Sequence, residues 1–146
     1  MKKKFLRGDM ALDTSVLVEV ALATSTGREL TEQVLSGNVR PYVTVLNLAE
    51  LLYVLCRLLG MSEAEERVKL IVDSNYFEIV SSDDLWRYIA DCKCRFAVSL
   101  ADCHTLALAR KYGIPALFYR LESEFKPITA ELRAWVGSEV FFIREE

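Results

Sequence analysis

Residues 10–23, MALDTSVLVEVALA, contain the pattern that decides the fold. A short apolar segment leads into the polar run Asp13-Thr14-Ser15, and a longer apolar run then continues to Ala23. A brief apolar segment fits a strand, and Asp, Thr or Ser directly before an apolar run is a usual helix start. We therefore predict a strand, a turn and a helix, with Asp13 just beyond the end of the strand.

The rest of the chain repeats this alternation of short β-type segments and longer helical segments, many of them bounded by capping residues, glycine or proline. Strands alternating with helices predict an α/β fold around a mostly parallel sheet. The expected strands are 10–12, 39–43, 77–80, 116–119 and 140–143, and the expected helices are 16–23, 28–35, 45–59, 62–73, 85–96 and 99–111.

The length and composition predict one compact domain over residues 1–146, with 1–9 as a flexible basic arm that contains Lys2, Lys4 and Arg7. The net charge of −3 argues against a broad nucleic-acid-binding surface. It does not exclude a nuclease, because a carboxylate cluster adds negative charge where a metal binds. Since no apolar run is long enough to span a bilayer and no secretory segment is visible, we expect a cytoplasmic protein with reduced cysteines and no membrane contact.

Two acids follow predicted strands, and both also have ordinary structural explanations. Parallel sheets form their sites beyond the carboxyl ends of strands, where Asp13 and Glu122 fall. Asp13 equally suits a helix cap, and Ser15 could steady it or a metal-bound water by a hydrogen bond. Glu122 and Glu124 equally suit a solvated turn.

Two further acids lie on predicted helices. Glu50 interrupts an apolar helix, where an ionised carboxylate is costly to bury unless something compensates it. A metal is one compensation, and a solvated polar stripe shared with Asn47 and Arg57 is the other. Asp102 lies where a capping box places an acid, in the first turn of helix 99–111. Mg²⁺ and Mn²⁺ prefer several carboxylates and waters, so these acids become a candidate site only if the fold brings them together.

Four segments in order along the chain resemble the PIN-domain family. They are residues 11–17 (ALDTSVL), 43–51 (VTVLNLAEL), 99–109 (SLADCHTLALA) and 115–125 (PALFYRLESEF). The resemblance implies a Rossmann-like, three-layer α/β/α fold in a single domain. It also implies a nuclease site with Mg²⁺ or Mn²⁺ at Asp13, Glu50 and Asp102, with Glu122 as the fourth acid.

The fourth segment departs from the family pattern, which more often has Asp behind Thr or Ser. Here it reads Arg120-Leu-Glu122, so Glu124 is also a candidate for the fourth acidic position, and Arg120 could instead contact RNA phosphate. The three core acids are unaffected by this departure.

The family resemblance implies a ribonuclease that hydrolyses RNA by a metal-activated water, similar to small VapC-type toxins. Such proteins are inhibited by a small antitoxin and are often homodimers. One alternative is a catalytically weak or inactive PIN fold that binds RNA or protein. Another is a phosphatase that forms a phospho-aspartate at Asp13, but such enzymes usually have a second Asp where Ser15 stands here.

Other chemistry-bearing residues have simpler explanations. Helical spacing favours core packing for Trp86, Tyr88 and Phe96 over stacking on bases. His104, two residues after Asp102 on one helix, is expected to point away from the site. The spacing of Cys92 and Cys94 disfavours a zinc site.

Overall fold

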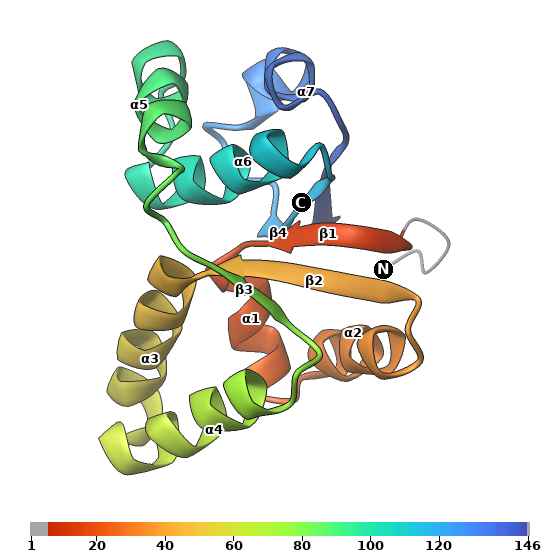
Figure 1. The fold of residues 1–146 in the computed structure, drawn as a ribbon, viewed down its shortest axis with the longest axis vertical. Coiled ribbons are helices and arrows are strands. Elements are labelled where there is room, and N and C mark those ends of the chain that lie inside the picture. Colours follow the sequence, from red (N-terminus) through yellow and green to blue (C-terminus); the bar gives the residue numbers. More distant parts are fainter. Residues whose placement is uncertain (1–5, 146) are drawn as a thin grey trace.

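The computed structural model describes residues 6–145, so Lys2 and Lys4 of the expected basic arm lie outside the described residues. Within this range all strand pairs are parallel and form one sheet in the order β3-β2-β1-β4-β5 (Figure 1). The strands are β1 (Gly8–Leu12), β2 (Val39–Thr44), β3 (Glu78–Val80), β4 (Ala116–Arg120) and β5 (Val140–Arg144).

Helices cover both faces of the sheet and complete three layers (Figure 1). Figure 1 shows α1 to α4 on one side and α5 to α7 on the other. The predicted α/β fold is thereby confirmed. The helices are α1 (Thr14–Ala21), α2 (Ser25–Leu35), α3 (Val45–Leu59), α4 (Met61–Asp73), α5 (Trp86–Arg95), α6 (Leu100–Tyr112) and α7 (Thr129–Val136), with a 3₁₀ turn at Lys126–Ile128.

The central strand β1 is apolar on both faces because both faces are covered. Ala11 packs into the core beneath α6, whereas Met10 and Leu12 pack into a second core against α1, α2 and α3. Each of these three side chains is fully buried. Pro41 lies within β2, where it has no N–H to donate, but β3 pairs with β2 only from Tyr42 onward.

The structure differs from the sequence predictions in two elements. Helix α7 was not predicted, because its apolar positions are few and follow a proline-containing turn. The prediction that Trp86 and Tyr88 pack in the core is wrong, since they are 61% and 36% exposed. The buried face here is formed instead by Leu85, just before α5, and by Ile89 and Cys92 within it. Trp86 lies outside this face.

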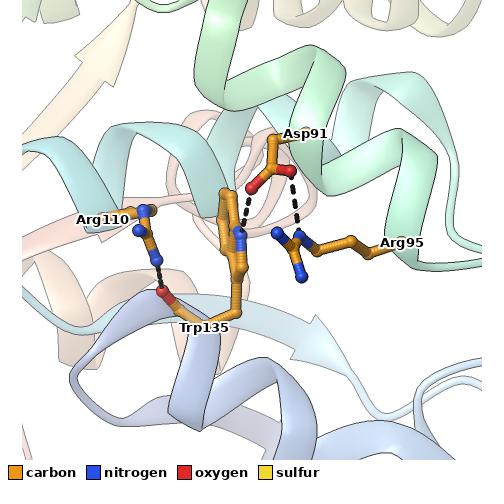
Figure 2. Close-up of polar contacts among 4 residues, drawn as sticks. All are labelled: Asp91, Arg95, Arg110 and Trp135. Atoms are coloured by element: carbon orange, nitrogen blue, oxygen red, sulfur yellow. Dashed lines mark hydrogen bonds and ion pairs between the residues drawn. The ribbon is translucent and has the colours of Figure 1, made fainter.

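A polar network connects α5, α6 and α7 (Figure 2). The indole N–H of Trp135 donates to Asp91 Oδ2 at 2.8 Å, and Arg95 Nε donates to Asp91 Oδ1 at 2.9 Å. Arg110 donates to the Trp135 carbonyl, and its guanidinium carbon lies 4.8 Å from the Trp135 ring centroid. The indole and Arg95 hydrogen bonds hold the pKa of Asp91 below its usual value.

Among residues 6–145, none of the helices combines the length and the apolar character needed to cross a bilayer.

Gly27 allows α2 to approach α1 closely, and we predict that Gly27→Ala destabilises the fold. A Cβ at this position would lie 1.9 Å from the backbone oxygen of Glu19, so the two helices would have to separate. Overpacking of this kind costs about 1–3 kcal/mol. Thermal unfolding should show a midpoint lowered by several degrees.

Gly37→Ala is the matched control. Its Cβ would meet nothing within 4 Å, and only the positive φ of 82° opposes it, at a cost of roughly 1–2 kcal/mol. Destabilisation by Gly27→Ala of less than about 1 kcal/mol would show that the α1–α2 contact can relax.

Candidate active site at the carboxyl edge of the sheet

Asp13 lies directly after the central strand and is 7% exposed. It caps α1: its Oδ2 accepts hydrogen bonds from the Ser15 backbone N–H at 3.1 Å and the Ser15 hydroxyl at 2.7 Å. Its Oδ1 accepts a bond from the Thr105 hydroxyl of α6 at 2.9 Å. Three donors therefore hold the carboxylate without any ligand. Asp13 can cap α1 and also belong to the site, so the two interpretations are compatible.

Glu50 faces the same edge from α3 and is half-buried. Its Oε1 accepts a hydrogen bond from the Thr14 hydroxyl at 3.1 Å, and Asn47 Nδ2 donates to that hydroxyl at 3.1 Å. Asn47 also completes the capping box of α3 with Thr44. Because Asn47 is fully buried, the polar side of α3 is not the solvated stripe considered above.

Burial is the main cause that raises the pKa of Glu50, and the charge of Asp13 raises it further. The Thr14 hydrogen bond opposes this rise, and so does the charge of His104. The carboxylates of Glu50 and Asp13 therefore lie within electrostatic reach of each other.

Asp102 lies in the first turn of α6, where its backbone N–H donates to the capping hydroxyl of Ser99 at 3.0 Å. Burial raises the pKa of Asp102 from 3.8 to about 7, and the charges of Asp13, Glu124 and Glu122 raise it as well. Acids from three separate segments therefore lie within electrostatic reach of one another.

Glu122 and Glu124 follow β4 in an exposed turn. The charge of Glu124 raises the pKa of Asp102 more than that of Glu122 does. From the sequence, Glu122 was the first choice for the fourth acid and Glu124 the alternative. The relative size of their effects on the pKa of Asp102 favours Glu124.

The donor set at this edge fits a hard divalent cation in chemical type, since it offers carboxylate oxygens. None of the ion pairs among residues 6–145 involves Asp13, Glu50 or Asp102. In the same range, no three His, Cys, Asp or Glu side chains stand close enough together to form a ready metal cluster. The side chains are therefore of the type that binds such an ion, but they are not preorganised around one.

Several polar residues of the site were not singled out from the sequence. Thr14 and Thr105 donate hydrogen bonds to Glu50 and Asp13, and Asn47 donates to Thr14. From the sequence, Thr14 was only part of a helix start, Asn47 only part of a polar stripe, and Thr105 was not named. His104 was expected to point away, yet it lies close enough to Glu50 to affect its pKa. The Nδ1 of His104 lies 2.9 Å from the Leu100 carbonyl, within its own helix.

The raised pKa of Asp102 predicts that Asp102→Asn stabilises the ion-free protein at high pH. Between about pH 4 and 7 the folded protein keeps a proton on Asp102 that the unfolded chain has lost, so stability falls as pH rises through this range. Above pH 7 the folded state bears a buried charge that asparagine removes. In chelator, thermal unfolding should give Asp102→Asn a higher midpoint than the unmodified protein at pH 8, and little difference at pH 4.

Glu66→Gln, at an exposed position of α4, is the control, because it also removes one negative charge. A gain for Asp102→Asn that is equal at both pH values would contradict the argument.

The fold and the sequence both match known proteins. The PIN domain family model matches residues 10–126. Similar solved structures include VapBC2 from Rickettsia felis bound to a promoter DNA fragment (TM-score 0.66, 14% identity, 94% of this chain and 99% of that chain). VapC20 from Mycobacterium tuberculosis, described as a sarcin–ricin loop cleaving toxin, is also similar (TM-score 0.64, 20% identity, 81% of this chain and 93% of that chain).

FitAcB from Neisseria gonorrhoeae is a third similar structure (TM-score 0.59, 17% identity, 90% of this chain and 96% of that chain). No curated protein matches the chain in sequence. At such low identities the solved structures support the fold alone, whereas the family model covers most of the sequence. The chain belongs to the PIN domain family.

Proposed function

We propose that this PIN-domain protein is a metal-dependent endoribonuclease that hydrolyses RNA phosphodiester bonds. Asp13, Glu50 and Asp102 would hold Mg²⁺ or Mn²⁺, with Glu122 or Glu124 completing the cluster. The observation that carries the proposal is the state of Asp102: burial first, and then the charges of Asp13, Glu124 and Glu122, raise its pKa to about 7, and it forms no ion pair among the described residues. The similarity to a toxin described as cleaving the sarcin–ricin loop supports it.

A divalent ion at this edge would lower the pKa of an attacking water and offset negative charge that develops on the phosphate. The residues of this chain supply the positioning. Thr105 and Ser15 fix both oxygens of Asp13, and Thr14 fixes one oxygen of Glu50. Ser99 caps the first turn of α6, and its hydrogen bond with Asp102 opposes the rise in the pKa of that carboxyl.

A PIN fold that binds RNA or protein without cutting it is the second candidate. It is favoured by one observation, that the side chains of residues 6–145 do not form a ready three-ligand cluster. Binding of Mn²⁺ separates the two candidates, because a degenerate site should bind it poorly.

The similarity to toxin–antitoxin complexes supports a small antitoxin as partner. A hollow of about 280 Å³ between α2 and α4 offers apolar side chains for such a contact, including Leu30, Val34 and Ile71. Leu35 and Leu70 at this hollow are 56% and 72% exposed, so a covering partner would remove much apolar surface from water.

A homodimer is a further part of the proposal, supported by exposed apolar residues of α3. Val45, Tyr53 and Leu58 are 55%, 48% and 60% exposed. We further propose that the protein acts in the cytoplasm, where its four cysteines, all free in the structure, would stay reduced.

The proposal predicts that purified protein cuts a mixed RNA pool with Mn²⁺ or Mg²⁺ and does not cut it in chelator. Asp102→Asn should abolish cutting and weaken Mn²⁺ binding while leaving the fold intact, because it removes a charged ligand. Gel analysis of the RNA and calorimetric titration of Mn²⁺ measure the two effects, with Glu66→Gln as the matched control. Undiminished cutting by Asp102→Asn would remove this residue from the site. No cutting together with no Mn²⁺ binding would favour the binding module.

The two candidates for the fourth acid give a separate prediction. Because Glu124 acts on Asp102 more strongly than Glu122, Glu124→Gln should lower the cleavage rate more than Glu122→Gln, by at least several-fold. Rates at saturating Mn²⁺ and the apparent Mn²⁺ affinity of each variant provide the comparison. The reverse order would return the fourth position to Glu122.

A further inference from the structure

Two arginines stand beside each other at the carboxyl edge of the sheet. Arg120 is the last residue of β4 and Arg144 the last of β5, and they are partners in the register of these two strands. Both residues are exposed. Since side chains of register partners point to the same face of a sheet, two positive charges are brought together at this edge.

Tyr119 fixes the position of these cations. Arg144 Nε donates to the Tyr119 hydroxyl at 2.9 Å. The guanidinium carbons of Arg120 and Arg144 lie 5.7 and 5.9 Å from the centroid of the same Tyr119 ring. The phenol occupies only one of the five N–H donors of Arg144, so both terminal nitrogens keep donors for a ligand.

No carboxylate of residues 6–145 forms an ion pair with either arginine. Like charges directly opposite on neighbouring strands destabilise a sheet. An anion between Arg120 and Arg144 would relieve this repulsion, and the planar guanidinium fork matches the oxygens of a phosphate.

This arginine pair is connected to the acids by two hydrogen bonds. The backbone N–H of Tyr119 donates to the Ser15 hydroxyl at 3.2 Å, and that hydroxyl donates to Asp13 Oδ2 at 2.7 Å. The strand end that carries Arg120 is therefore tied directly to the carboxylate of Asp13 at the same edge of the sheet.

We propose that Arg120, Arg144 and Tyr119 form a phosphate-binding subsite that holds an RNA strand next to the bond that is cut. The subsite rests on the proposed nuclease function and names residues that would bind its substrate. It also provides local attraction for a polyanion in a chain whose net charge is −3.

The test measures binding of labelled, mixed-sequence, single-stranded RNA in chelator, where no cutting interferes, over a range of salt concentrations. Arg144→Gln and Arg120→Gln should each weaken binding several-fold at low salt. Each should also reduce the slope of log Kd against log salt concentration by about 0.7, the value for one lost phosphate contact on a single strand. Arg28→Gln, an exposed arginine of α2 without an ion pair among the described residues, should change neither quantity.

Tyr119→Phe separates positioning from charge. It retains the ring and both arginines but removes the oxygen that accepts from Arg144 Nε. Affinity should fall while the salt slope stays unchanged. Circular dichroism verifies the fold of each variant. If Arg144→Gln fails to fold, Arg144→Lys keeps the charge without the fork and should retain the slope with reduced affinity.

The outcomes separate this inference from the nuclease proposal. Binding by Arg144→Gln and Arg120→Gln that equals binding by Arg28→Gln would overturn the subsite, even if the unmodified protein cuts RNA. Weakened binding by both variants, in a protein that never cuts with Mn²⁺ or Mg²⁺, would support the subsite and overturn the nuclease. If a polyglutamate peptide bound through the same arginines while RNA did not, the RNA assignment would be overturned.

Discussion

The carboxylate of Asp13 is the constraint on which the rest of the structure depends. The central strand ends at this residue, α1 begins after it, and Thr105 attaches it to α6. Ser15 extends the same network to the backbone of β4. One side chain therefore links the consecutive elements β1 and α1 to α6 and β4, which lie far along the chain. An acid this buried is tolerable because three donors satisfy it and because it lies at a helix N-terminus, where negative charge is favoured.

The other acids add to this constraint by repelling one another. Fields from Asp13, Glu122 and Glu124 act on Asp102, and Asp13 also acts on Glu50. A fold selected for stability alone would separate these charges or neutralise them with lysine or arginine. These acids lie at the edge where parallel sheets form sites, and their mutual repulsion destabilises the folded state. A bound cation would offset this cost, since a ligand that binds only the folded state adds to its stability.

Much of the fold could be predicted from the sequence, because short apolar segments and capping residues are local signals. All five strands were predicted to within two residues at either end, and Asp13 and Asp102 could be placed at helix starts. The strand order could not be derived from local pattern, since nothing in β1 itself indicates that β2 and β4 flank it. Helix α7 was missed because its amphipathic pattern is short. The site roles of Thr105 and Asn47 were missed because they exist only once α6 meets the end of β1 and α3 meets α1.

The resemblance to the PIN domain family, carried by four ordered segments, is confirmed by the family model. The resemblance could not predict whether Glu122 or Glu124 acts more strongly on Asp102. Both lie in one exposed turn, and local sequence does not indicate how far each is from Asp102. Nor could it predict Arg144, which lies beyond residue 126, where the family match ends, and gains its neighbours only through the pairing of β4 with β5.

The position of α5 has a consequence for how this protein can diverge. This helix packs mainly on α6, is tied to α7 through Asp91 and Trp135, and presents Trp86, Arg87 and Cys94 to solvent. Substitutions at such outward positions usually change stability by no more than about 0.5 kcal/mol. Packing therefore constrains the inner sheet and its acids, whereas the solvent-facing side of α5 tolerates substitution, and new surface chemistry can arise there in small steps.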